Sequence, residues 1–172
     1  MNLRKYIAEI PDFPKPGILF YDIAPLIRSP SAWNYAMDSL KEKISPLKPA
    51  VIAGIDARGF LVGAGLSSKM NLGFLMVRKK GKLPGKTISE KYALEYRSDE
   101  LEIQSQALEA DTRVILVDDL LATGGTATAS VRLIEKSGAK VVGSAFLIEL
   151  TSLNGRDAIG DLPIFSLLKL NS

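Results

Sequence analysis

Apolar residues recur along this chain in short runs that are separated by glycine, proline and charged residues. The run at 114–117 has no polar alternation, so it predicts a strand that is buried on both faces, in the middle of a parallel sheet. Comparable runs predict further strands at 50–55, 74–78, 140–150 and 164–168, with less regular ones at 92–96 and 101–108.

Helix-forming segments alternate with these runs. Ser29 followed by Pro30 is typical of a helix start, and an amphipathic stretch continues to Ile44. Further helices are expected at 60–70, up to residue 136 and at 154–159. The alternation predicts an α/β fold: a largely parallel, twisted sheet flanked by helices, with residues 1–172 forming a single domain.

The stretch 79–91 is rich in lysine and is punctuated by glycine and proline. It has no apolar period, so we expect either a long mobile loop or an extended hairpin. The cationic run that begins at Arg78 could be a solvated loop that discourages aggregation. It also fits a polyphosphate ligand better than a long nucleic acid, which would favour a broader basic face.

Composition narrows the chemistry. The 172 residues include no cysteine and no histidine, which excludes a disulfide framework, a Cys/His zinc site and a histidine-dependent nucleophilic triad. Acid–base catalysis must then use a carboxylate, lysine or tyrosine. The net charge is +3, no apolar run is long enough to span a bilayer, and the first residues lack the apolar core of a signal peptide, so we expect a cytoplasmic protein.

The strongest candidate site follows the 114–117 strand. Asp118 and Asp119 stand at its carboxyl end, where open α/β sheets bind their ligands. The small-residue turn Ala122-Thr123-Gly124-Gly125-Thr126 comes next and opens a helix. Its glycines let backbone N–H groups converge on an anion at the helix N-terminus. The combination predicts a ligand with both a phosphate and ribose hydroxyls.

Two other strand exits carry charge. One is Asp56-Ala57-Arg58-Gly59, and the other is the run from Arg78 to Lys82. Because the carboxyl ends of parallel strands share one edge of the sheet, these cations and the Asp118-Asp119 pair should meet around one crevice. The cations suit a pyrophosphate. The acids suit ribose hydroxyls, or a magnesium ion reached through them.

The run 114–126 resembles the phosphoribosyl-pyrophosphate-binding motif of the type I phosphoribosyltransferases. Further segments resemble the members of that family that use adenine, in the family's order and spacing from about residue 4 to 170. These segments are 11–14, 16–20, 57–61, 78–85, 94–96, 101–104, 149–153 and 165–168.

The resemblance implies magnesium-dependent transfer of a phosphoribosyl group from 5-phosphoribosyl 1-pyrophosphate to adenine, which yields AMP and pyrophosphate. It also implies a small hood built from N-terminal segments, a flexible catalytic loop and a homodimer. Magnesium would be held mainly by the substrate, with no direct protein cage. Neither a nucleic acid nor a membrane is an expected partner.

The resemblance also assigns roles to residues. Asp118 and Asp119 would hold the ribose hydroxyls, and the 122–126 turn would hold the 5-phosphate. The pyrophosphate would contact a set that includes a strained or cis Asp56–Ala57 peptide: Asp56, Ala57, Arg58, Arg78, Lys79 and Lys82. The adenine ring would lie between Phe20 and Leu120, its edge would meet the backbone of Leu19 and Tyr21, and Tyr96 would help to close the pocket.

Glu95 and Arg58 are the implied catalytic residues. Glu95 would handle the proton of the base, a role that suits a partly desolvated carboxylate in a chain without histidine. From the residues alone, Glu95 would be taken for a solvated strand residue. The chain departs from the family at Tyr21, where arginine is common, and at Arg97, where glycine is usual.

Two alternatives stay open. The same reaction could use hypoxanthine, guanine or xanthine, whose 6-oxo group needs a donor where the adenine amino group needs an acceptor. The second alternative is a regulator that senses phosphoribosyl pyrophosphate and binds nucleic acid. Such a protein needs a basic face or an added DNA-binding module, whereas the positive charge here is concentrated in one stretch.

Overall fold

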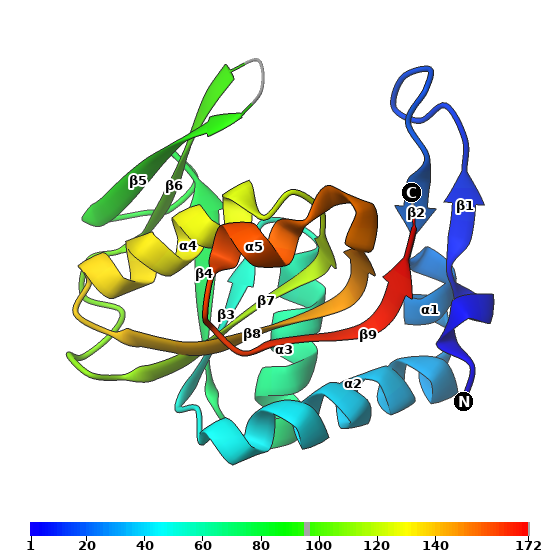
Figure 1. Cartoon of the computed structure of the whole chain (residues 1–172). Coiled ribbons are helices and arrows are strands. Elements are labelled where there is room, and N and C mark those ends of the chain that lie inside the picture. The colour runs from blue at the N-terminus through cyan, green and yellow to red at the C-terminus, as the bar shows by residue number, and fades with distance from the viewer. Residues whose placement is uncertain (95–96, 172) are drawn as a thin grey trace.

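The computed structural model describes residues 1–94 and 97–171 of the chain. Within this part, a mixed sheet has the strand order β5-β6-β4-β3-β7-β8-β9 (Figure 1). Its strands are β3 (Val51–Ile55), β4 (Gly73–Lys79), β5 (Thr87–Leu94), β6 (Arg97–Gln104), β7 (Arg113–Leu121), β8 (Lys140–Leu150) and β9 (Ile164–Leu170). The β4-β3-β7-β8-β9 pairs are parallel, and β6 pairs antiparallel with β4 and β5. The α/β fold with a largely parallel sheet is therefore confirmed.

Helices cover both faces of this sheet. They are α1 (Ala24–Arg28), α2 (Pro30–Ile44), α3 (Gly59–Met70), α4 (Gly125–Lys136) and α5 (Gly155–Ile159), with 3-10 turns at Leu3–Tyr6, Ser45–Leu47 and Thr151–Leu153. The Ser29 side chain accepts a hydrogen bond from the backbone N–H of Ala32, so the predicted cap of α2 is confirmed. Helices α2 and α3 pack on one face of the sheet, and α4 and α5 lie on the other (Figure 1).

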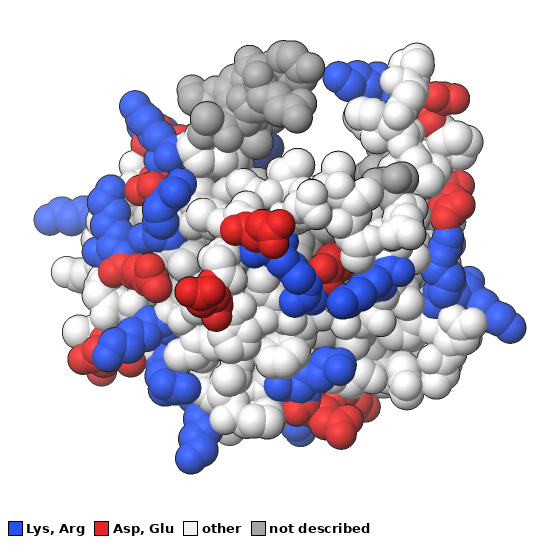
Figure 2. Space-filling view, viewed as in Figure 1, with Lys and Arg blue, Asp and Glu red and all other residues white. Residues whose placement is uncertain are grey.

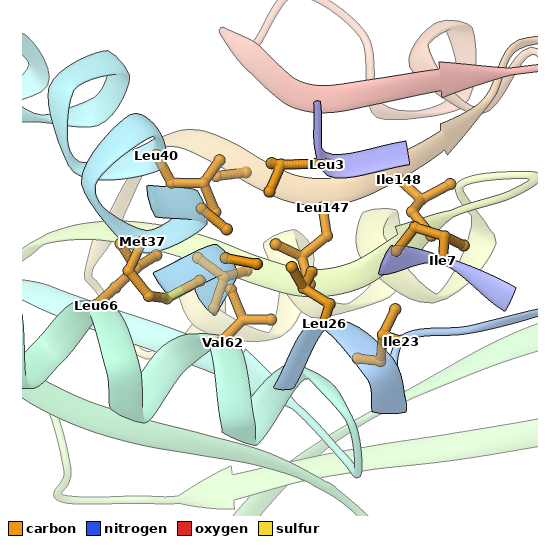
Figure 3. Packing of buried hydrophobic residues seen from close by; sticks show 14 of the residues in the cluster. Leu3, Ile7, Ile23, Leu26, Met37, Leu40, Val62, Leu66, Leu147 and Ile148 are labelled. Atoms are coloured by element: carbon orange, nitrogen blue, oxygen red, sulfur yellow. The ribbon is translucent and has the colours of Figure 1, made fainter. Parts of the chain in front are cut away.

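The core is divided by the sheet into two layers. Along β7, Ile115 and Val117 face α2 and α3, whereas Val114 and Leu116 face α4. This alternation explains why the run is apolar without a break: a strand covered on both faces has no solvent side. Figure 3 shows the α2–α3 layer, in which Met37, Leu40, Val62 and Leu66 form one cluster with Leu147 and Ile148 of β8.

The N-terminal segments form a separate two-stranded antiparallel sheet from β1 (Ala8–Ile10) and β2 (Phe20–Asp22). This sheet, the hood, stands beside the main sheet next to α1 (Figure 1). The proline-rich segment between β1 and β2 turns the chain with a cis Phe13–Pro14 bond and with Gly17 at φ +84°. The hood that the resemblance implied is present.

The stretch 79–91 leads from the end of β4 into an extended hairpin that β5 and β6 form. An extended hairpin was the second of the two expected alternatives. β5 begins at Thr87, earlier than the expected strand at 92–96. The strand predicted at 101–108 was too long, because β6 ends at Gln104. There the chain turns: the N–H of Ser105 donates to the carbonyl of Lys86 at 2.9 Å, and the N–H of Ala107 donates to that of Gln104 at 3.2 Å.

Among the residues that the structure describes, no helix is both long enough and apolar enough to cross a membrane.

Candidate active site

Asp118 and Asp119 lie in the last part of β7, which continues to Leu121 beyond the predicted end of the strand. Because β7 is flanked by β3 and β8, both acids stand at the carboxyl edge in the middle of the sheet. The backbone N–H of Asp119 donates to Oδ1 of Asp118 at 2.8 Å. Asp119 is 4% exposed, whereas Asp118 is only partly buried and lines two adjacent cavities.

The surroundings of this pair disfavour two negative charges. Burial raises the pKa of Asp118 well above its usual value, and the neighbouring charge of Asp119 raises it further. Burial also raises the pKa of Asp119, although the charge of Arg58 acts in the opposite direction. Two acids in this environment attract groups that donate hydrogen bonds or carry positive charge, such as hydroxyls or a cation.

Residues 122–126, the cradle, connect β7 to α4. They line a cavity of about 100 Å³ whose wall also includes Asp118, Leu120 and Phe146. Gly124 has φ +82°, and the carbonyl of Gly124 accepts a hydrogen bond from the N–H of Thr128 at 2.8 Å in the first turn of α4. The first N–H groups of this helix have no partner within it, so they are available to an anion.

A second, larger cavity of about 440 Å³ adjoins the cradle. It brings together most of the charged residues that the sequence marked, from the three strand exits. Its wall is formed by Ile55, Asp56, Ala57, Arg58, Lys79, Tyr92, Asp99, Leu101, Asp118, Asp119, Leu120 and Thr126. The three charged strand exits that the sequence predicted, at 56–59, 78–82 and 118–119, therefore do meet at one edge of the sheet.

Arg58 connects this cavity to the hood. Its Nε lies 2.9 Å from Oδ2 of Asp119, and its Nη1 donates to the backbone carbonyl of Tyr21 at 3.4 Å. The guanidinium also lies over the ring of Phe20, 4.7 Å from its centroid. Oδ2 of Asp119 has no hydrogen bond of good geometry among the described residues, so its contact with Arg58 is ionic in character. The Asp56–Ala57 peptide that precedes Arg58 is cis.

The remaining cations lie near the second strand exit. Nε of Arg78 donates to Oδ2 of Asp56 at 2.9 Å, and Nη1 of Arg78 donates to the carbonyl of Lys82 at 3.1 Å. Nζ of Lys79 lies 4.0 Å from a carboxylate oxygen of Asp99. Arg78 and Lys79 therefore each have an acidic partner close to the cavity. We refer to Arg58, Arg78, Lys79 and Lys82 as the cation cluster.

Two residues near the cavity were missed by the sequence reasoning. Glu102 is 4% exposed, and its Oε1 accepts hydrogen bonds from the N–H groups of Lys82 at 3.0 Å and Leu83 at 2.9 Å. Burial acts to raise the pKa of Glu102, but backbone hydrogen bonds from Leu83, Gly81 and Lys82 outweigh it, and the pKa is lowered. The one signal in the sequence that pointed to Glu102 was its position between two apolar strand residues, Leu101 and Ile103.

Tyr92 is the second missed residue. It is 8% exposed, and its hydroxyl accepts a hydrogen bond from Oγ1 of Thr126 at 3.4 Å. The contact joins the β5–β6 hairpin to the cradle across 34 residues of sequence. Periodicity could identify Tyr92 as a strand residue, but it could not indicate this partner.

Some predicted residues lie elsewhere. Lys82 is exposed and does not line the cavity, and Leu19 is 39% exposed on the hood. The side chain of Tyr21 is 3% exposed in the core, which leaves its backbone to face the site. Glu95 and Tyr96 lie outside the described residues.

No cluster of three or more acidic side chains that could hold a metal is present in residues 1–94 and 97–171. The two carboxylates of Asp118 and Asp119 nevertheless face the cavity. Such a set fits Mg²⁺, which commonly keeps one or two carboxylates and takes its other ligands from substrate phosphates and water.

Charges of both signs are interspersed over the face seen in Figure 2, which carries no unbroken basic surface. Long nucleic acids favour a continuous basic stripe. The two adjoining cavities, by contrast, bring together the start of α4, the Asp118-Asp119 pair and the cations of Arg58 and Lys79. This arrangement can bind one molecule that carries two separate phosphate groups joined by a polyhydroxylated unit.

Comparison with known proteins agrees with this chemistry. A family model described as the phosphoribosyl transferase domain matches residues 33–168. The chain is 55% identical over 168 residues to adenine phosphoribosyltransferase from Gluconobacter oxydans (strain 621H), which covers 98% of this chain and 93% of that protein.

Solved structures are similar over nearly the whole chain. The crystal structure of adenine phosphoribosyltransferase from Thermoanaerobacter pseudethanolicus superposes with a TM-score of 0.95 at 47% identity and covers 98% of both chains. That of the enzyme from Saccharomyces cerevisiae, complexed with adenine and an imino-altritol bisphosphate, has a TM-score of 0.90 at 40% identity and covers 96% of both chains.

Proposed function

The chain belongs to the phosphoribosyltransferase family, and we propose that it transfers the phosphoribosyl group of 5-phosphoribosyl 1-pyrophosphate to adenine, in purine salvage. In this reaction the bond between C1 of the ribose and the pyrophosphate oxygen breaks, and a bond from C1 to a ring nitrogen of adenine forms. The products are AMP and pyrophosphate. One observation carries the proposal: the cradle, the Asp118-Asp119 pair and the cations of Arg58 and Lys79 surround adjoining cavities.

The donor binds along the end of β7. Backbone N–H groups of the cradle and the hydroxyls of Thr123 and Thr126 hold the 5-phosphate at the start of α4. Asp118 and Asp119 accept hydrogen bonds from the ribose 2- and 3-hydroxyls. Their position next to the cradle supports this assignment, because a ribose that is anchored by its 5-phosphate extends toward both carboxylates.

The leaving pyrophosphate takes the other side of the cavity. Positive charge develops on the ribose ring in an oxocarbenium-like transition state, while negative charge develops on the pyrophosphate. Arg58, Arg78, Lys79 and Lys82, with the Asp56–Ala57 backbone, stabilise that departing charge. The position of Arg58 and Lys79 on the cavity wall supports this role, and Arg78 is tied to the wall through Asp56.

Adenine binds between this cavity and the hood. Phe20 and Leu120 pack against its two faces, and the backbones of Leu19 and Tyr21 contact its edge. Two contacts support this placement: Arg58 stacks on Phe20, and Leu120 lines both cavities. The base loses its ring N–H proton as it attacks C1, and the proton passes to the Glu95 carboxylate while Tyr96 closes the pocket.

Mg²⁺ belongs to the same proposal. The ion would be held mainly by the donor, and Asp118 and Asp119 would reach it through the ribose hydroxyls. When bound, it neutralises charge on the pyrophosphate and so makes this group a better leaving group.

We also propose that residues 1–172 form a single catalytic domain that acts as a homodimer in the cytoplasm. Large apolar side chains are exposed along the hood at Ile10, Phe13, Ile18 and Leu19, which supports a protein partner there. We expect light scattering after size exclusion to give twice the mass of one chain. The mass of one chain would contradict the dimer and leave the chemistry untouched.

Release of pyrophosphate tests the proposed function. The purified chain is incubated with 5-phosphoribosyl 1-pyrophosphate, Mg²⁺ and, in separate reactions, adenine, hypoxanthine, guanine or xanthine. We expect release with adenine and little with the 6-oxo bases. Faster release with a 6-oxo base would move the specificity to that base. Absence of release with every base, together with a gel shift of DNA or RNA, would favour the nucleic-acid-binding regulator.

A further inference from the structure

Helix α5 lies directly behind the cradle. The first residue of α5, Gly155, is so close that a Cβ atom there would lie 2.2 Å from the carbonyl oxygen of Ala122. From the other side, a Cβ on Gly124 would lie 2.4 Å from the carbonyl oxygen of Gly155. Neither distance is possible for real atoms, so the two backbones touch only because both residues are glycine. Thr128 adds a hydrogen bond from its Oγ1 to the carbonyl of Ala158 at 2.8 Å.

A helix of five residues has few contacts of its own to hold it in place. Here Arg156, the second residue of α5, forms a bidentate ion pair with Glu149 on β8: Nε lies 2.5 Å from Oε1, and Nη2 lies 2.7 Å from Oε2. Nη1 of Arg156 donates to the carbonyl of Ile164 at 2.9 Å, and the hydroxyl of Ser166 donates to Oε2 of Glu149 at 2.5 Å. The helix is thus tied to β8 and β9 together.

Glu149 is 5% exposed, and burying a carboxylate is costly unless hydrogen bonds satisfy it. The contacts with Arg156 and Ser166 do so, and Arg156 foremost lowers the pKa of Glu149. An apolar side chain would fill this position at less cost in free energy. The Glu149–Arg156 ion pair is therefore better explained by the segment that it holds in place, the first turn of α5. Glu149 is paired in register with Leu121, the residue immediately before the cradle.

We propose that Glu149 and Arg156 are positioning residues for the phosphate cradle: they hold the first turn of α5 against Ala122 and Gly124, and so set the affinity for the 5-phosphate end of the donor. This role rests on the proposed function of the cradle. If the pair is broken, α5 can retreat, and the cradle loses the wall that keeps its N–H groups convergent. Neither side chain lines the cavities or touches substrate, so the effect is confined to donor binding.

Steady-state kinetics of Glu149→Gln and Arg156→Lys test this role. Glutamine keeps the size of the side chain but loses its charge, and lysine keeps the charge but loses the bidentate geometry. We expect the KM for 5-phosphoribosyl 1-pyrophosphate to rise about tenfold, because small misplacements of binding groups are expensive. The KM for adenine and the kcat at saturation should stay within about twofold of the unsubstituted chain. The double variant should be little worse than either single variant, since the pair acts as a unit.

Asp111→Asn is the matched control. Asp111 pairs with Lys140 at the opposite end of β8, and both of these side chains are well exposed. Asparagine tolerates the positive φ of this position, so kinetics and Tm should be unchanged.

Calorimetric titration with ribose 5-phosphate gives a readout that does not depend on turnover, and we expect weaker binding by both variants. A lower Tm with unchanged donor KM would overturn the proposal and leave the pair a purely structural one. An equal change in both KM values and kcat would also overturn it. If the unsubstituted chain binds ribose 5-phosphate but releases no pyrophosphate, the proposed function fails while the positioning role can still be measured.

Discussion

The cradle and the cation cluster lie at adjoining cavities but are held in different ways. The cradle is contiguous in sequence, and its positions are dictated by β7, by α4 and by close contact with α5. The cations come from two strand exits, and three of them lie near carboxylates: Arg58 at Asp119, Arg78 at Asp56 and Lys79 at Asp99. A ligand on the cradle meets preformed backbone donors, whereas a ligand on the cluster must compete with acids for its cations.

This contrast matters for catalysis. Preorganised donors give affinity at low cost, which suits the part of the donor molecule that does not change during the reaction. Cations that exchange an acid for the pyrophosphate can stabilise charge as that charge develops. The cradle therefore binds the ribose phosphate that is retained in the product, and the cation cluster stabilises the pyrophosphate that leaves.

The largest expected effect comes from Asp118, which lies next to the cradle and lines both cavities. Asp118→Asn keeps an oxygen that can accept from the N–H of Asp119 but removes the charge next to the ribose. We expect kcat/KM for 5-phosphoribosyl 1-pyrophosphate to fall by about 10²-fold or more, as for the loss of one transition-state contact. The exposed Asp161 offers the control, and Asp161→Asn should keep full activity. Near-normal turnover of Asp118→Asn would remove this carboxylate from the site.

An intermediate effect is expected where the cation cluster is anchored. Glu102→Gln leaves the side chain the same size but weakens the hydrogen bonds that hold the turn at Lys82 and Leu83. Inhibition by pyrophosphate should weaken about tenfold, because charged acceptors hold backbone N–H groups more strongly than neutral ones. Glu109→Gln, at an exposed position, is the control. If pyrophosphate inhibits the Glu102 variant as strongly as the unsubstituted chain, the turn does not depend on this anchor.

The contact between the β5–β6 hairpin and the cradle should have a smaller effect. Tyr92→Phe removes only the hydroxyl that meets Thr126. We expect kcat/KM to fall about threefold, the value of one weak neutral hydrogen bond. Tyr35→Phe, which changes an exposed tyrosine, should change nothing. In a Thr126→Val background the Tyr92 substitution should have no further effect, and full additivity of the two would show that they act separately.

Asp118, next to the cradle, and Glu102, which anchors the turn at Lys82, should make contributions to stability that respond to pH with opposite sign. The pKa of Asp118 is raised from 3.8, so its contribution to stability is full below about pH 3.8 and is lost as the pH rises through the raised pKa. The pKa of Glu102 is lowered from 4.5, so its contribution is present above about pH 4.5 and is lost as the pH falls.

Thermal unfolding of Asp118→Asn and Glu102→Gln measures this difference. At pH 7 we expect the Asp118 variant to melt above the unsubstituted chain and the Glu102 variant to melt below it. Both differences should shrink in acid. Curves that run parallel to that of the unsubstituted chain at every pH would mean that neither carboxyl is perturbed.

The contrast also separates what the sequence could predict from what it could not. β7, the two acids and the cradle follow one another in the chain, so local pattern and turn chemistry were enough to predict their arrangement. The meeting of the three strand exits followed from the geometry of parallel sheets. A local signal also predicted the Ser29 cap.

The partners of these residues were not predictable in this way. The contact between Arg58 and Asp119, the anchoring of Lys82 by Glu102 and the packing of Gly155 on Ala122 each join segments that are far apart in the chain. Hydrophobic periodicity indicates which face of a strand is buried but not which loop lies above it. For the same reason the end of β6 was misplaced, since the Ser105–Lys86 pairing that closes the hairpin is a tertiary contact.

The division between the two regions can be measured by calorimetric titration of separate ligands, ribose 5-phosphate and pyrophosphate with Mg²⁺. We expect Asp118→Asn to weaken ribose 5-phosphate binding by about tenfold or more and to leave pyrophosphate binding within about twofold. Arg78→Met should do the reverse. If each variant weakens both ligands to the same extent, the cradle and the cation cluster do not act as separate sites for the two halves of the donor.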